Sequence, residues 1–112
     1  MKSQPDNCTP EELRDKRAAG EKFLLLDVRT AREHAIVRLD PCVHVPVQEL
    51  EDSLDQLLPW RDHEIIVLCH HGIRSARAQA CLRAHGFTRV RNLTGGIDAY
   101  AARADTTLPR YR

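Results

Sequence analysis

One cysteine stands where the chain changes from a buried strand to a helix. The stretch IIVLCHHGIRSARAQACL, residues 65–82, begins with four apolar residues and reaches Cys69 directly after them. Five residues rich in hydrogen-bond donors follow, and a helical pattern starts near Ser75. Ligand sites in open α/β sheets gather at the carboxyl ends of strands, so Cys69 is a candidate nucleophile.

The residues after Cys69 favour an ionised sulfur. A tight turn over residues 69–74 aims several backbone N–H groups into one concavity, and Gly72 supplies the backbone freedom that such a turn needs. Ser75 is a good N-cap, the helix start adds a partial positive charge, and Arg74 adds a full one. An ordinary thiol is only about 3% ionised at pH 7, whereas lowering its pKa by roughly 2 units makes it about three-quarters ionised. The sequence therefore predicts a site for an anionic sulfur.

The other cysteines and the adjacent histidines favour less reactive roles. Cys81 lies on the inward stripe of its helix, Cys42 is expected to be structural, and Cys8 is expected in a frayed N-terminal segment. The lack of a C-x-x-C pair and of a secretory signal counts against a zinc cage and against disulfides. His70 and His71 on a tight turn are expected to point in different directions, lining the pocket mouth. No metal and no organic cofactor is expected.

Strand and helix signals alternate along the chain. Unbroken apolar runs are typical of strands covered on both faces, and the expected strands are 23–28, 43–45, 65–68 and 89–93. The expected helices are 10–19, 30–35, 47–58, 75–85 and 95–104. This order predicts one α/β domain with a central, mostly parallel sheet of about five strands and helices on both faces. Its core spans about 9–103, with tails at 1–8 and 105–112, the second loosely held.

Composition limits the classes of function. At 112 residues the chain suits one domain, and its 42% hydrophobic and 29% charged residues are ordinary for a globular protein. The net charge of +1 offers no support for a surface that binds nucleic acid or an anionic membrane. No stretch approaches a membrane span or a signal peptide, so a cytoplasmic location is expected.

Three stretches together resemble the rhodanese-like sulfurtransferases, of the single-domain thiosulfate sulfurtransferase type. LLLDVRTAREHA is similar to the family's strand-and-turn motif, with Asp27, Arg29 and Glu33 in the usual acid, arginine and acid positions. CHHGIRSARAQACLRAHGF is similar to its active-site loop and following helix, and VRNLTGGIDAY to its closing strand, double glycine and last helix. The resemblance runs from about residue 9 to 103 and implies a single rhodanese-like domain.

The resemblance implies a double-displacement reaction. Cys69 would attack the outer sulfur of thiosulfate or of a small persulfide, become a persulfide itself, and pass that sulfur to cyanide, a thiol or a protein acceptor. The active-site loop that would bind the substrate consists of His70, His71, Gly72, Ile73, Arg74 and Ser75. Arg74 would help to bind an anionic donor, and Asp27 and Arg29 would buttress the pocket. Arg29 is also placed to form a local ion pair with Glu33.

The sequence departs from the family pattern after the first motif. Val37 and Pro41 stand where the family commonly has glycines, and Arg38 replaces the usual histidine. Tyr100 in the last helix stands where a tryptophan is frequent. These substitutions leave the substrate preference open, while the catalytic loop keeps the family pattern.

Two other functions compete with sulfur transfer. A cysteine-dependent phosphatase needs Cys-x5-Arg to brace a phosphoryl group, whereas Arg74 comes one place earlier and Ser75 occupies the phosphatase arginine position. A non-catalytic docking module of this family often lacks the cysteine, which this chain retains. The sequence leaves open the donor and acceptor, the oligomeric state, and whether Cys42 lies close enough to Cys69 to resolve its persulfide.

Overall fold

Strands and helices alternate along residues 6–112, the part of the chain that the computed structural model describes. The strands are β1 (Asn7–Cys8), β2 (Leu24–Asp27), β3 (Val43–His44), β4 (Ile65–Leu68) and β5 (Val90–Leu93). The helices are α1 (Pro10–Ala18), α2 (Ala31–Ile36), α3 (Leu54–Leu57), α4 (Ile73–Ala84) and α5 (Gly96–Arg103). The predicted α/β class is confirmed.

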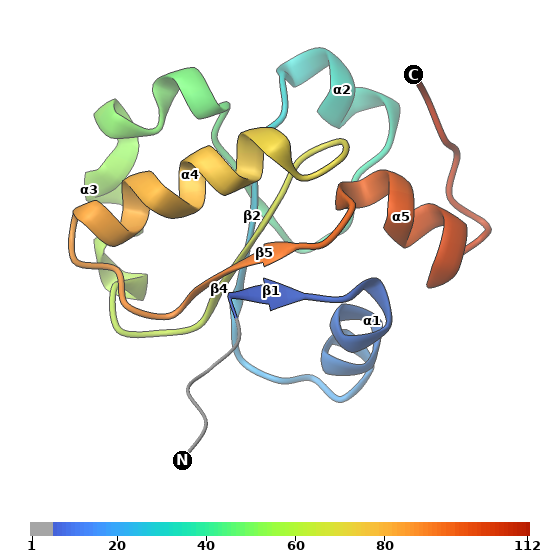
Figure 1. The fold of residues 1–112 in the computed structure, drawn as a ribbon, viewed down its shortest axis with the longest axis horizontal. Helices are drawn as coiled ribbons and strands as arrows, with labels where there is room; N and C mark the ends of the chain where they lie inside the picture. The colour runs from blue at the N-terminus through green and yellow to red at the C-terminus, as the bar shows by residue number, and fades with distance from the viewer. Residues whose placement is uncertain (1–5) are drawn as a thin grey trace.

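Within the described residues the five strands form one parallel sheet in the order β1-β5-β4-β2-β3. Every residue of β2 and β4 is buried, as the unbroken apolar runs predict. Helices α3 and α4 cover one face of the sheet, and α1 and α5 cover the other (Figure 1). Asp27 pairs in register with Leu68, so the carboxyl ends of β2 and β4 lie side by side.

Helix α1 begins where the sequence predicts and ends one residue earlier, and it lacks the full capping box that the spacing of Thr9 and Glu12 predicts. The Thr9 hydroxyl accepts a hydrogen bond from the Glu12 backbone N–H at 3.0 Å, and Gly20 ends the helix with a φ of +68°. The Glu12 side chain does not complete the expected capping box, because it accepts a hydrogen bond from the buried Arg91 on β5 at 2.8 Å.

The single helix predicted for residues 47–58 is wrong. Short 3-10 turns at Val47–Glu49, Glu51–Ser53 and Leu58–Trp60 surround the four-residue α3. The broken path still buries Leu50 and Leu57 against α4 and the sheet, while Leu58 is exposed. Short helices are marginal by themselves, so tertiary packing decides the backbone path here.

Helix α4 starts two residues earlier than predicted. Gly72, with a φ of +107°, is the residue before the helix, and Ile73 is its first residue. Leu82 on the predicted inward stripe is fully buried, but Cys81 is only half-buried and His85 is exposed. The helix therefore presents a narrower apolar stripe than its sequence indicates.

The position of Cys8 in the sheet corrects its expected place in a frayed segment. Cys8 has no exposed surface and lies in β1, which pairs with β5 in parallel. A two-residue strand is too short to show a hydrophobic period, so sequence patterns miss it. The predicted tail at 1–8 lies partly outside the described residues. Among the described residues, no helix is both long and apolar enough to cross a membrane.

The position of Cys8 predicts that it resists alkylation in the folded protein. Burial and the neighbouring Glu12 carboxylate raise the pKa of the Cys8 thiol to about 12, so almost no thiolate is present at neutral pH. Iodoacetamide followed by peptide mass mapping should leave Cys8 unmodified while it labels Cys69. Unfolding in guanidinium is the control and should expose all four cysteines. Rapid labelling of Cys8 in the folded protein would show that β1 is not docked.

Candidate active site

The Cys69 sulfur lies inside the turn between β4 and α4. Its Sγ atom accepts a hydrogen bond from the Gly72 backbone N–H at 3.0 Å and lies 3.3 Å from the Ser75 hydroxyl. The predicted N-cap role of Ser75 is wrong, because α4 begins at Ile73 and Ser75 lies in its first turn. Its hydroxyl therefore faces the sulfur rather than the start of the helix.

Hydrogen bonds favour the thiolate form of Cys69. Burial opposes ionisation, but bonds from the Ser75 hydroxyl and from the backbone of Ser75, Gly72 and Arg74 lower the thiol pKa below its ordinary value. The Arg74 guanidinium, expected to lend its full charge to the sulfur, forms a two-pronged ion pair with Glu33 at 2.6 and 2.8 Å. Glu33 accordingly raises the pKa of Arg74 more than Cys69 does.

Asp27 and Arg29 form a buried ion pair at the carboxyl end of β2. Asp27 Oδ2 lies 2.7 Å from Arg29 Nη2, and Arg29 also donates to the Val37 carbonyl oxygen at 2.6 Å. Burial opposes ionisation of Asp27, but hydrogen bonds from Arg29 and His34 hold its pKa below the usual range. This arrangement supports the proposed buttressing role of both residues.

Glu33 joins α2 to the turn over residues 69–74, called the catalytic turn here after its predicted role, and sequence reasoning misses this link. The expected ion pair with Arg29 is wrong, since Arg29 reaches only the backbone carbonyl oxygen of Glu33, at 3.2 Å. The carboxylate binds Arg74 instead and also caps its own helix at Thr30. The hydrogen bonds from Arg74 are the largest cause that holds the Glu33 pKa far below its usual value.

Residues 105–112, expected to be loosely held, pack beside the catalytic turn. The Tyr111 hydroxyl donates to Glu33 Oε2 at 2.7 Å and accepts from Arg29 Nη1 at 3.1 Å. Its ring meets His70 edge-on, with the ring centroids 4.0 Å apart. Arg110 forms an ion pair with Asp98 of α5 at 2.9 Å. Side-chain contacts, rather than regular secondary structure, hold this segment. A search for helical or strand periodicity in the sequence therefore cannot detect it.

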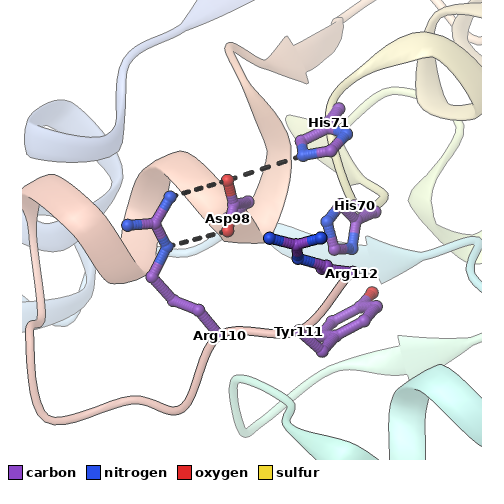
Figure 2. Close-up of a pocket in the computed structure, with 6 residues that line it drawn as sticks. All are labelled: His70, His71, Asp98, Arg110, Tyr111 and Arg112. Carbon is purple, nitrogen blue, oxygen red and sulfur yellow. Dashed lines mark hydrogen bonds and ion pairs between the residues drawn. The ribbon is translucent and has the colours of Figure 1, made fainter.

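Two pockets open between this segment and the catalytic turn. One has a volume of about 480 Å³ and is lined by His70, His71, Asp98, Arg110, Tyr111 and Arg112 (Figure 2). The second, of about 470 Å³, lies toward α2 and shares His70, His71, Tyr111 and Arg112 with the first. Arg32 and Arg112 both line the second pocket and form no ion pair with any residue from 6 to 112. Pockets of this size and charge suit a small anionic ligand.

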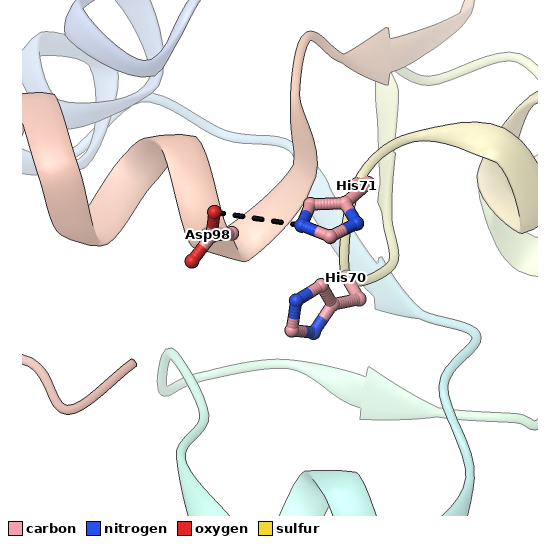
Figure 3. A group of neighbouring side chains, drawn as sticks. All are labelled: His70, His71 and Asp98. Atoms are coloured by element: carbon pink, nitrogen blue, oxygen red, sulfur yellow. Dashed lines mark ion pairs between the residues drawn. The ribbon is translucent and has the colours of Figure 1, made fainter. Parts of the chain in front are cut away.

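His70 and His71 lie at the mouth of the turn with their rings nearly perpendicular, at 85° (Figure 3). His70 is buried, and its desolvation together with the neighbouring His71 lowers its pKa. His71 is exposed and its Nε2 lies 3.5 Å from Asp98. These three side chains could approach one metal ion, but Arg110 already holds both oxygens of the Asp98 carboxylate. The expectation of no metal stays a prediction.

Helix α5 supports the catalytic turn from its other side. The backbone N–H groups of Ile97 and Asp98 donate to the carbonyl oxygens of Cys69 and His70 at 2.8 and 3.1 Å. This approach requires a glycine at position 96, because a Cβ there would collide with both carbonyl oxygens. The double glycine thus positions the turn as well as starting the helix.

Asn92 is a further polar residue of the site that sequence reasoning misses. It lies in β5, and its side chain contacts Gly72 and Ser75 of the catalytic turn. The alternating run RVRNL indicates a strand but does not show that Arg91 and Asn92 are both buried. The available signal was an asparagine inside a strand that the parallel sheet should bury, because buried polar side chains are uncommon and need partners.

Cys42 packs on the opposite face of the sheet from Cys69. Cys42 packs with the hydrophobic cluster on the α1 and α5 face, whereas Cys69 belongs to the cluster on the α3 and α4 face. Burial and the nearby Asp27 raise the pKa of Cys42, which suits the predicted structural role. All four cysteines are free thiols. Among the departures from the family pattern, Arg38 pairs with Asp40 at the surface.

The fold and this site define a class of protein: a parallel α/β domain that holds a cysteine among N–H donors at the end of a central strand. Comparison with known families then identifies the family. The rhodanese-like domain matches residues 9–103, and the chain belongs to this family.

Relatives of the chain include proteins named as sulfurtransferases. The Adenylyltransferase and sulfurtransferase MOCS3-1 of Zea mays is 35% identical over 97 residues, which are 82% of this chain and 21% of that protein. The chain thus spans about a fifth of the length of such curated relatives. A Rhodanese-like domain protein from Staphylococcus aureus superposes with a TM-score of 0.80 at 25% identity, covering 96% of this chain and 100% of that chain. The human single-domain sulfurtransferase TSTD1 shares the fold, with a TM-score of 0.78, 24% identity and coverage of 89% and 98%.

Gly96→Ala should destabilise the protein more than the control variant Gly20→Ala, because Gly96 contacts the catalytic turn. Gly96 and Gly20 both have a φ of +68°, but a Cβ at Gly20 meets nothing within 4 Å. Both variants carry the same backbone strain, so Gly96→Ala should cost about 1–3 kcal/mol more in urea unfolding because of its collisions. It should also slow alkylation of Cys69. Equal losses in the two variants would show that α5 does not press on the turn.

The hydroxyl of Tyr111 should stabilise the docked segment. Tyr111→Phe keeps the ring on His70 but removes the hydrogen bonds to Glu33 and Arg29, so the free energy of unfolding should fall by about 1–2 kcal/mol. The control is Arg112→Ala, in the same segment but without a hydrogen bond to any described residue, which should change it by less than about 0.5 kcal/mol. Urea titration measures both. No loss in Tyr111→Phe would mean that the segment does not hold this position in solution.

Proposed function

We propose that the protein transfers sulfane sulfur through a persulfide on Cys69. One observation carries this proposal: the Cys69 sulfur accepts the Gly72 N–H inside a turn whose hydrogen bonds lower its pKa. Membership of the rhodanese-like family supports a transferase role, and the loop that resembles the family's active site is the one that holds this sulfur.

The reaction would proceed in two displacements. The Cys69 thiolate attacks the outer sulfur of thiosulfate, the S–S bond of the donor breaks, and sulfite leaves with the bonding electrons. The product is a Cys69 persulfide, whose terminal anionic sulfur the N–H groups of the turn can stabilise. Cyanide or a thiolate then attacks this terminal sulfur, and Cys69 leaves as the thiolate. A lowered thiol pKa favours that departure.

The charges around the pockets support an anionic donor. Arg74, expected to bind the donor, is already occupied by Glu33. Arg32 and Arg112 line the pocket without an ion pair to any described residue, so they are better placed to bind a sulfonate or a carboxylate. A small persulfide with an acidic group would meet the same cations.

The competing functions receive less support from the site. A phosphatase needs a guanidinium over the cysteine, and here Arg74 binds Glu33 while Ser75 occupies the position that such an arginine would take. Ile73 at the rim of the turn is 76% exposed, which suits contact with a protein acceptor of sulfur as well as a docking role. The cytoplasmic location and the lack of cofactor, nucleic-acid and membrane partners stay predictions from composition.

Intact-mass spectrometry after incubation with thiosulfate tests the proposed reaction. The protein should gain the mass of one sulfur atom, and cyanide should remove it. Cys69→Ser should gain nothing, whereas Cys81→Ser, which changes a half-buried thiol away from the turn, should gain sulfur like the parent protein. No added mass from thiosulfate or from an organic persulfide, with unchanged binding of a partner protein, would favour the docking role instead.

A further inference from the structure

Asn92 makes two hydrogen bonds, one to Gly72 and one to Ser75. The first bond determines which group is the donor in the second. Asn92 Nδ2 donates to the Gly72 carbonyl oxygen at 3.0 Å, while Asn92 Oδ1 lies 2.5 Å from the Ser75 hydroxyl. A carbonyl oxygen can only accept, so the amide nitrogen must face Gly72 and the amide oxygen must face Ser75. The amide oxygen carries no proton either, so Ser75 is the donor in the second bond.

The Ser75 hydroxyl has one proton and two neighbouring acceptors. Besides Asn92, it faces the Cys69 sulfur at 3.3 Å, and the Ser75 residue has no exposed surface. When Cys69 is a thiol, its S–H can donate to Ser75 while Ser75 donates to Asn92, and every group is satisfied. When Cys69 is a thiolate, the sulfur and the amide oxygen both require the same proton.

We propose, resting on the sulfur transfer proposed above, that Asn92 is a positioning residue whose amide oxygen competes with the Cys69 sulfur for the single hydroxyl proton of Ser75. If the Ser75 hydroxyl donates to Asn92, the thiolate faces a lone pair of the hydroxyl oxygen. If it turns to the sulfur, the buried amide oxygen loses its donor. Either arrangement disfavours the empty thiolate and offsets part of the stabilisation from the backbone N–H groups.

The competition ends once sulfur has been transferred. In the persulfide the negative charge lies on the terminal sulfur, and the inner sulfur of Cys69 has neither a proton nor a charge. Ser75 can then donate to Asn92 at no cost to the sulfur. Asn92 therefore raises the free energy of the empty thiolate but not that of the persulfide, which favours uptake of sulfur from the donor.

The pH dependence of Cys69 alkylation tests this competition without any sulfur donor. The midpoint of the profile reports ionisation and does not depend on how often the turn opens to the reagent. Asn92→Ala should move the midpoint to lower pH, each unit being a tenfold gain in thiolate below the midpoint. Ser75→Ala should move it to higher pH. The double variant should match Ser75→Ala, because Asn92 acts only through the Ser75 proton.

A purely structural role for Asn92 gives the opposite sign. Loosening the turn would withdraw N–H groups from the sulfur and move the midpoint of Asn92→Ala upward, which would overturn the proposal. So would a double variant shifted below Ser75→Ala by the full effect of Asn92→Ala. Gln79→Ala is the matched control, since Gln79 also joins α4 to β5, at the Val90 carbonyl oxygen, but does not contact Ser75. Its midpoint should equal that of the parent protein.

A second variant keeps the test decisive should Asn92→Ala fail to fold. Asn92→Asp retains an acceptor for the Ser75 proton and adds a negative charge, so the midpoint of its alkylation profile should rise. The rise should be smaller when Ser75 is also replaced by alanine. An equal rise with Ser75 and with alanine at position 75 would overturn the proposal. The other ionisable groups on the elements around the turn are unchanged in all variants: Asp27, Glu33, His70, Arg74, Asp98 and Tyr111. The alkylation profiles use no sulfur donor. They therefore test the competition for the Ser75 proton even if the protein proves not to transfer sulfur.

Discussion

The hydrogen bond from the Gly72 N–H to the Cys69 sulfur is the contact on which the rest of the site depends. It requires the chain to reverse within three residues, which the positive φ of Gly72 permits. It also requires a fixed starting point, which the buried strand β4 provides, and a fixed end, which α4 provides. The environment of the Cys69 sulfur is therefore a property of the junction between two elements rather than of the cysteine side chain alone.

Full charges surround the sulfur, yet most are already paired. Arg29 binds Asp27, Arg74 binds Glu33, and Arg110 binds Asp98. The first of these pairs is buried and the second is half-buried, so an unpaired charge in either would be costly, whereas Arg110 is exposed. What remains to act on the sulfur is a set of oriented N–H dipoles and one hydroxyl. In the proposed sulfur transfer, the fixed N–H dipoles would need no reorganisation when charge moves from one sulfur to the next.

How much of the fold and of the candidate site the sequence predicts depends on how far apart the interacting residues lie along the chain. Strands β2 and β4 and the turn after β4 follow from local signals: unbroken apolar runs and a glycine at the point of reversal. The partner of Arg74, the role of Asn92 and the docking of Tyr111 depend on residues from 17 to 78 positions apart, which no local period encodes. Strand β1 is too short to show a period, and the 3-10 turns of 47–60 share the helical spacing that predicted one helix.

The attachment of α5 to the carbonyl oxygens of Cys69 and His70 has a mechanical consequence. Any displacement of this helix along its axis must either break those two backbone bonds or carry the reactive sulfur with it. Arg103 of α5 pairs with Glu11 of α1, and Arg17 of α1 binds Tyr100 of α5, so side-chain contacts join the two helices. Backbone and side-chain bonds thereby connect the turn that holds Cys69 to α1 by way of α5.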